Sequence, residues 1–406
     1  MPDPVRHDAP PSRVAEILAV FLRLGCTCFG GPVAHIGYFR AEFVDRRRWL
    51  SERAFADLVA LCQFLPGPAS SQTGFAVGLM RGGLGGGIAA WLGFTLPSAA
   101  IMVGFAYGVA WLDPGSGAGW LHGLKLVAAA AVAQAAWAMG QSLCPDRPRV
   151  GLAIAAALLC AAAPLPAVQM LAIALGAGIG WAWYRRAMAA EKGDPEPAAE
   201  VRLPRGVSLA SGIAFAALLA AIPLASAAGG APALLGAIYR AGALVFGGGH
   251  VVLPLLESGV ADPGWVSDDE FLAGYGVAQA VPGPLFTFGG FLGAAADLGD
   301  AGAARWLLGA LAIAAIFLPG TLLILALMPH WSALRDRPGA RAALAGANAA
   351  VVGILAAALY DPIWTAAVTG PRDFAFFCGA LGLLIAAKLP PWLVVIAGAA
   401  AGGWLL

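Results

Sequence analysis

Hydroxyl side chains follow two Pro-Gly-Pro motifs in an otherwise apolar sequence. The motifs lie in "QFLPGPASSQTGF" (residues 63–75) and "QAVPGPLFTFGGF" (residues 279–291). The hydroxyl residues are Ser70, Ser71 and Thr73 after the first motif and Thr287 after the second. A helix that starts at such a turn exposes unpaired N–H groups and the positive end of its dipole, which attract anions. The pattern therefore predicts an anion-binding site at these helix starts.

Two further glycine breaks, "FGGP" (residues 29–32) and "FGGGH" (residues 246–250), resemble the tips of chain reversals. Glycine lets the backbone turn sharply and approach a ligand closely. The glycines expected at the four tips are Gly30, Gly31, Gly67, Gly247, Gly248 and Gly283. His35 and His250 follow the two glycine breaks. Each could either contact the ligand or form a structural hydrogen bond, and the sequence leaves both roles open.

Arg23 and Arg240 stand at matched positions, each six residues before a Phe-Gly-Gly sequence. A charged side chain within an apolar segment is costly and by default marks a transport pathway. We therefore expect both arginines to bind substrate. The alternative for each is a side chain that extends to the lipid headgroups, since Arg23 is close to the polar N-terminal residues.

A further set of polar residues and prolines is expected to have a structural or gating role. Pro66, Pro68, Pro282 and Pro284 shape the turns, and Gln63 and Gln279 are expected to bond the backbone there, with ligand contact second. Lys125 lies deep in an apolar segment, and its counterpart in the second copy of the sequence is Asn348. A polar contact is therefore needed at that position, and a charge is not.

The composition is that of a polytopic α-helical membrane protein. Of 406 residues, 60% are hydrophobic and 12% are charged, and the mean hydropathy is +0.79. Many apolar runs reach the roughly 20 residues that a spanning helix needs, and they lack the alternation of barrel strands. The net charge of +1 gives no basic field for nucleic acid. The N-terminal stretch lacks the apolar core of a signal peptide.

The chain contains two copies of one pattern, separated by the polar residues 185–205. The matches occur in the same order: "RLGCTCFGG" with "RAGALVFGG", "RRWLSERAF" with "PGWVSDDEF", the Pro-Gly-Pro motifs, "TLPS" with "FLPG", and "GLKLV" with "GANAA". We therefore expect a first half, residues 1–186; a cytoplasmic linker, residues 187–206; an unmatched connecting helix, residues 207–224; and a second half, residues 225–406.

Loop charges predict that the halves are inverted in the membrane. Residues 40–53 hold five arginines, whereas the matching residues 257–270 hold no Lys or Arg. Cytoplasmic loops are enriched in Lys and Arg, so equivalent loops face opposite sides. Residues 55–80 have Arg on both flanks and residues 271–296 have acid on both, so each segment is expected to enter and return as a re-entrant hairpin. A kinked spanning helix is the alternative.

Signals for catalysis are weak. The acidic run "DDE" (residues 268–270) lacks a second acidic cluster for metal–diphosphate chemistry, and the sequence has no Gly-x-x-x-x-Gly-Lys-Ser/Thr motif. Cys26 and Cys28 form a C-x-C pair without a matching pair, so neither a metal nor a cofactor is expected. Transport driven by an ion gradient is favoured. An intramembrane enzyme acting on a lipid-linked phosphate stays open as the alternative.

The stretches "FGGP", "FLPGPASSQTG", "FGGGHVVLPLL" and "QAVPGPLFTF" resemble signature sequences of the chromate transporter family in its long two-domain form. The resemblance covers essentially the whole chain. It implies export of chromate from the cytoplasm across the bacterial inner membrane, driven by the proton motive force, with sulfate as a competing anion. Long members are usually drawn with about thirteen spans, whereas the charges here favour about nine crossings with four re-entrant segments.

Several alternatives stay open at the level of sequence. Sulfate and chromate are tetrahedral dianions of similar size, so a sulfate or other oxyanion transporter is the second hypothesis. The expected partners are the transported anion and the lipid bilayer. A homodimer is the one protein assembly that the sequence leaves open.

Overall fold

The computed structural model describes residues 11–111, 118–163, 165–190, 203–246, 252–261, 263–298, 305–331 and 337–405. Helices dominate these residues, and no strand occurs among them. Five helices are long and apolar enough to cross a membrane, or six if the bent pair α8 and α9 is one span, and four shorter apolar helices accompany them. The expected all-α polytopic membrane protein is confirmed.

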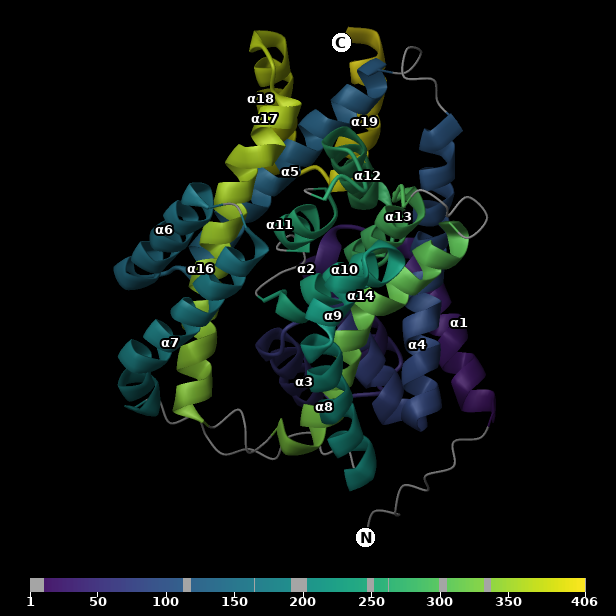
Figure 1. Cartoon of the computed structure of the whole chain (residues 1–406). Helices are drawn as coiled ribbons and strands as arrows, with labels where there is room; N and C mark the ends of the chain where they lie inside the picture. Colours follow the sequence, from purple (N-terminus) through teal and green to yellow (C-terminus); the bar gives the residue numbers. More distant parts are fainter. Residues whose placement is uncertain are drawn as a thin grey trace.

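Figure 1 shows the order and arrangement of the helices. The first half contains α1 (Pro11–Thr27), α2 (Gly31–Arg40), η1 (Ala41–Arg46), α3 (Glu52–Phe64), α4 (Ala69–Trp111), α5 (Ala118–Leu143), α6 (Arg147–Ala162) and α7 (Pro166–Ala190). The connection contains α8 (Arg205–Ala220) and α9 (Ile222–Ala228), bent by 42° at their junction.

The second half repeats this order with some elements shortened or divided. It contains α10 (Gly230–Leu244), α11 (Val252–Leu256), η3 (Glu257–Ala261), α12 (Asp268–Ala280), η4 (Leu285–Thr287), α13 (Phe288–Ala295), α14 (Arg305–Leu327), η5 (Met328–His330), α16 (Pro338–Ala358), η6 (Leu359–Trp364), α17 (Thr365–Ala367), α18 (Pro371–Ile385) and α19 (Pro391–Leu405).

The long element α4 is two antiparallel helices joined at Gly82 and Gly83. Both glycines have non-helical backbone angles, and Gly83 has φ 62°, a conformation that favours glycine. The two arms touch where a Cβ atom on Gly78 would lie 2.6 Å from the Cβ atom of Ala90. The apolar run from Ala69 therefore reverses direction, and only its second arm is long enough to span a bilayer.

Residues 55–80 enter and return, as the sequence predicts. Helix α3 has 13 residues, or about 20 Å, which is shorter than the roughly 30 Å of a bilayer core. Trp49 lies just before α3, and the guanidinium of Arg81, at the end of the returning arm, lies 5.3 Å from its ring centroid. Because both ends of the segment meet at Trp49, the structure favours the hairpin over a kinked spanning helix.

The second half contains the matching hairpin, formed by α12, η4 and α13. Ser267 caps the N-terminus of α12, as Ser51 caps that of α3. At the far end of the hairpin the amide of Asp297 donates to the carbonyl of Trp265 at 2.8 Å. Trp265 and Asp297 correspond to Trp49 and Arg81 in the sequence repeat. Equivalent residues thus close the base of each hairpin.

A long helix of each half packs against the last helices of the other half. Helix α5 packs against α18 and α19, while α16 packs against α6 and α7, and Figure 1 shows the first group at the top of the molecule and the second on the left. Small residues allow the close approach, as where a Cβ atom on Gly123 of α5 would lie 3.0 Å from the Cα atom of Gly402 of α19. Neither group of helices is therefore built from one half alone.

Candidate functional site

The first Pro-Gly-Pro tip is held by residues of the second half. Gly67 has φ 125°, and its amide donates to the carbonyl of Val245, directly after α10, at 2.7 Å. A Cβ atom on Gly67 would lie 2.8 Å from Nε2 of Gln72 and 3.1 Å from Cα of Gly320. The position therefore requires glycine for both its backbone conformation and its packing.

The second tip has the reciprocal arrangement. Gly283 has φ 94°, and its amide donates to the carbonyl of Cys28, directly after α1, at 2.8 Å. A Cβ atom there would lie 2.9 Å from Oγ of Ser98 and 3.1 Å from the carbonyl oxygen of Phe94. Ser98 corresponds to Gly320 in the repeat. Each tip therefore contacts two matched positions: the residue before a Phe-Gly-Gly sequence, and Ser98 or Gly320.

Four consecutive polar side chains are buried in the first turn of α4: Ser70, Ser71, Gln72 and Thr73. Nδ1 of His35, which is 1% exposed, lies 3.4 Å from Oγ of Ser70. The Nε2 atom of His35 and the Oγ atom of Ser71 are also buried, and neither forms a well-aligned hydrogen bond within the described part of the chain, although the His35 ring lies beside the backbone carbonyl of Cys28. Both atoms lie beside the helix start.

The two threonines that were expected to bind the ligand instead bond the backbone. The hydroxyl of Thr73 donates to the carbonyl of Ala69 at 2.8 Å, and that of Thr287 donates to the carbonyl of Pro284 at 2.8 Å. A threonine hydroxyl has one proton to donate. In this structure both threonines therefore bond the backbone of their own tip, and neither hydroxyl proton is left for a ligand.

The two helix starts differ in polarity. After the second tip the chain forms the three-residue 3₁₀ helix η4, whose Leu285 and Phe286 are buried. The Nε2 atom of Gln279, before that tip, is buried and has no hydrogen-bond partner among the residues that the structure describes. The first helix start thus has four buried polar side chains in its first turn, whereas the second has apolar Leu285 and Phe286 there and one unpartnered amide nitrogen before the tip.

The expected role of Gln63 is taken by another residue. Gln63 is exposed and forms no hydrogen bond within the described segments, whereas Nε2 of Gln72 donates to the carbonyls of Pro66, at 2.9 Å, and Gly320, at 3.3 Å. Gln72 thus ties the first tip to α14. The sequence offered no signal for this beyond its position one turn after the motif.

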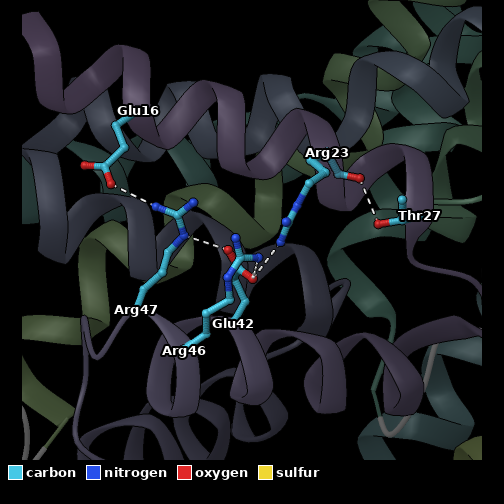
Figure 2. Close-up of polar contacts among 6 residues, drawn as sticks. All are labelled: Glu16, Arg23, Thr27, Glu42, Arg46 and Arg47. Atoms are coloured by element: carbon cyan, nitrogen blue, oxygen red, sulfur yellow. Dashed lines mark hydrogen bonds and ion pairs between the residues drawn. The ribbon is translucent and has the colours of Figure 1, made fainter.

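Arg23 lies in an ion-pair cluster centred on Glu42, shown in Figure 2. Its Nη2 atom lies 2.6 Å from Oε2 of Glu42, a carboxylate only 6% exposed that also binds Arg46 at 3.0 Å and Arg47 at 2.6 Å. Arg47 extends the cluster to Glu16 of α1 at 2.9 Å. Burial alone would raise the pKa of Glu42, but the hydrogen bond from Arg47 and the charges of all three arginines hold that pKa below its usual range.

Arg240 has a different environment. Its guanidinium lies beside Gly259 of η3, where a Cβ atom would be 3.4 Å from Nη2. The repeat shifts by one residue between its Phe-Gly-Gly sequences and the Trp49/Trp265 match, so Glu42 is matched by Ser258 or Gly259, and neither is acidic. Arg240 is half-buried and forms no ion pair with a described residue. Of the two matched arginines, Arg23 is therefore the one bound to a carboxylate among the described residues.

The remaining predicted residues are placed as follows. Gly30 and Gly31, with φ 97° and 76°, begin α2. Lys125 of α5 binds Asp269 of α12 at 2.7 Å, and Asn348 of α16 has a buried Oδ1 without a hydrogen-bond partner in the described ranges. Gly247, Gly248 and His250 lie outside the described residues. Within the described residues no group of three His, Cys, Asp or Glu could hold a metal ion.

Comparison with known proteins gives a consistent result. The family model described as Chromate transporter matches residues 15–181 and 232–403. The chain is 30% identical to the chromate transport protein of Pseudomonas aeruginosa, over 98% of this chain and 93% of that protein. It is 28% identical to the probable chromate transport protein of Synechococcus elongatus, over 98% of each.

A third relative, the chromate transport protein of Cupriavidus metallidurans, is 27% identical over 87% of this chain and 83% of that protein. No solved structure matches. The family is one of transporters, so the alternative of an intramembrane enzyme is set aside. With the family model covering both halves, this multi-pass membrane protein belongs to the chromate transporter family.

Proposed function

We propose that this chain is a secondary active transporter that exports chromate from the cytoplasm across the bacterial inner membrane, driven by the proton motive force. The anion binds at the start of α4, beside the first Pro-Gly-Pro tip. Family membership supports chromate as the transported anion. The site, the direction and the driving force are the parts that this proposal adds.

The observation that carries the site is the pair of unpartnered atoms beside the first turn of α4. A buried polar group without a partner costs about 1–3 kcal/mol, so a ligand that satisfies it is favoured. The hydroxyl of Ser71 and a protonated Nε2 of His35 would each donate to an oxyanion. The unpaired N–H groups of the helix start add further donors and a partial positive charge.

Arg240 supplies the full positive charge that a dianion needs on leaving water. It lies five residues before Val245, whose carbonyl accepts the amide of Gly67. That separation is about 7.5 Å along a helix axis, so α10 brings Arg240 near the first tip. A guanidinium can donate to two oxygens of a tetrahedral oxyanion at once, which an ammonium cannot match.

The proposal includes inverted halves. The base of the first hairpin joins Trp49 to Arg81 beside the arginines of η1, and the base of the second joins Trp265 to the acidic residue Asp297. Cytoplasmic ends are enriched in Lys and Arg, so the first base lies on the cytoplasmic side and the second outside. This orientation supports a substrate site between two related halves.

Transport by the purified protein in lipid vesicles tests the function. Labelled chromate and labelled sulfate are supplied separately and in competition, with an imposed proton gradient, and initial rates are compared with those of empty vesicles. We expect gradient-dependent chromate transport that sulfate inhibits. Transport of sulfate with no transport of chromate would instead support the second hypothesis, an oxyanion transporter with another physiological substrate.

The same assay tests variants of the proposed site, in which Ser70 and Ser71 of α4 are replaced by alanine. The Ser211→Ala variant, altered at a buried serine of α8, is the control for these variants.

A further inference from the structure

The two matching hairpins are packed unequally. The arm α12 lies against α5, where a Cβ atom on Gly276 would lie 2.9 Å from the carbonyl oxygen of Leu124. At the base of the same arm Nζ of Lys125 lies 2.7 Å from Oδ1 of Asp269. The Lys125 side chain is 11% exposed and the Asp269 side chain is 71% exposed. This ion pair therefore closes the junction of α12 and α5 at its outer edge.

The corresponding arm α3 is uncovered along the matching face. Ala56, Ala60 and Gln63 are exposed, and their spacing places them on one side of the helix. They correspond to Leu272, Gly276 and Gln279, of which the first two are buried and the third is half-buried. Within the described residues α16 packs mainly on α6 and α7, and α3 has no comparable contact with α16.

The residue of α16 that matches Lys125 borders an open space. Asn348 lines a cavity of about 250 Å³ together with Ser142, Arg149, Met188 and Arg341. Its Oδ1 has no hydrogen-bond partner in the described ranges. Of the two matched residues, Lys125 is thus held in an ion pair with the hairpin arm α12, whereas Asn348 borders a mostly apolar cavity beside two arginines and has no such contact with α3.

We infer that Lys125 and Asp269 form the outer gate of this transporter and that the structure is its cytoplasm-open state. In the outward-open state α12 leaves α5, and the exposed face of α3 closes against α16. This inference rests on the proposed transport between inverted halves. An ion pair with one exposed partner is weak and screened by salt, so it can open during each cycle.

Cysteine accessibility tests the gate without any transported anion. The Ala60→Cys and Leu272→Cys changes are made singly in a chain without its native cysteines and treated with a membrane-impermeant maleimide from either side. We expect Ala60→Cys to react from the cytoplasmic side and Leu272→Cys to be protected from both sides. Equal reactivity of the two matched positions, or protection of Ala60→Cys, would overturn the inferred state.

The gate itself is tested by adding Asp269→Asn to both reporters, with Asp268→Asn in the same helical turn as the control. Loss of the pair should raise labelling of Leu272→Cys from outside several-fold and lower that of Ala60→Cys. Exchanging the charges, with Lys125→Asp and Asp269→Lys together, should restore protection, which distinguishes gating from misfolding. Unchanged labelling in Asp269→Asn would remove the gate role. Because no substrate is used, a chain that carried sulfate and not chromate would leave this result intact.

Discussion

The backbone amide of Gly283 lies 2.8 Å from the carbonyl oxygen of Cys28, and the equivalent amide of Gly67 lies 2.7 Å from the carbonyl oxygen of Val245. Cys28 and Val245 each precede a Phe-Gly-Gly sequence, one in each half. Each hairpin tip is therefore bonded to the residue that precedes the Phe-Gly-Gly sequence of the other half. The interlocking explains why irregular backbone is tolerated here, since its polar groups are satisfied within the protein.

Alanine at either tip should impair transport. Gly67 and Gly283 both have positive φ, and a Cβ atom at either position would lie within 3 Å of a neighbouring side chain. The strain alone costs about 1–3 kcal/mol. We expect Gly67→Ala and Gly283→Ala to lower the melting temperature in detergent and to reduce chromate transport. Gly37→Ala, where a Cβ atom meets nothing within 4 Å, is the control. Normal transport by both tip variants would mean that the tips are ordinary kinks.

The serines of α4 should affect substrate affinity more than maximal rate. Removing the hydroxyls of Ser70 and Ser71 together leaves the helix N–H groups in place. Each lost hydrogen bond is worth about 0.5–1.5 kcal/mol, so the double alanine variant should raise KM by about fivefold to a hundredfold. Thr73→Val removes a hydroxyl that already bonds its own helix, and it should change KM little. Equal effects of the two variants would place the anion elsewhere.

The matched arginines should not be equivalent. Arg240→Ala removes a charge that forms no ion pair with a described residue, so we expect it to abolish most transport. Lysine at that position should restore only part of the transport rate, because lysine cannot donate to two oxygens with the bidentate geometry of arginine. Arg23→Ala should reduce transport less, since Glu42 remains paired with Arg46 and Arg47. Initial rates in inverted membrane vesicles, normalised to inserted protein, decide the matter, and a greater loss from Arg23→Ala would reverse the assignment.

The cluster around Glu42 should contribute to stability in a pH-dependent way. Since the folded protein lowers the pKa of Glu42, its contribution is present above the ordinary glutamate value of about 4.3 and is lost as pH falls below it. Glu42→Gln should lower the free energy of unfolding by about 1–3 kcal/mol at neutral pH. The difference in melting temperature between the variant and the natural chain should shrink as pH falls from about 4.3 toward about 3. A constant difference across that range would contradict the role of the carboxylate.

The hairpins were predictable because local features specify them. Arg flanks one segment and acid flanks the other, and Pro-Gly-Pro marks each tip. Such signals depend on residues that are close in sequence.

The contacts that define the site join residues far apart in sequence, which explains why they were missed. His35 meets Ser70, Gln72 reaches Gly320, and Glu42 binds Arg23. Equal roles for Arg23 and Arg240 followed from their matched positions. The matched positions did not reveal that the carboxylate partner, Glu42, has no acidic residue at the equivalent place in the second half.

Equilibrium binding of chromate to the purified protein, measured by calorimetry, tests the central claim most directly. Binding at the start of α4 beside Arg240 predicts that Ser71→Ala and Arg240→Ala each raise the Kd, the second by at least about tenfold. The same account predicts that Arg23→Ala and Ser211→Ala bind nearly as the natural chain does. Unchanged affinity in Ser71→Ala and Arg240→Ala, with all four variants folded, would contradict it.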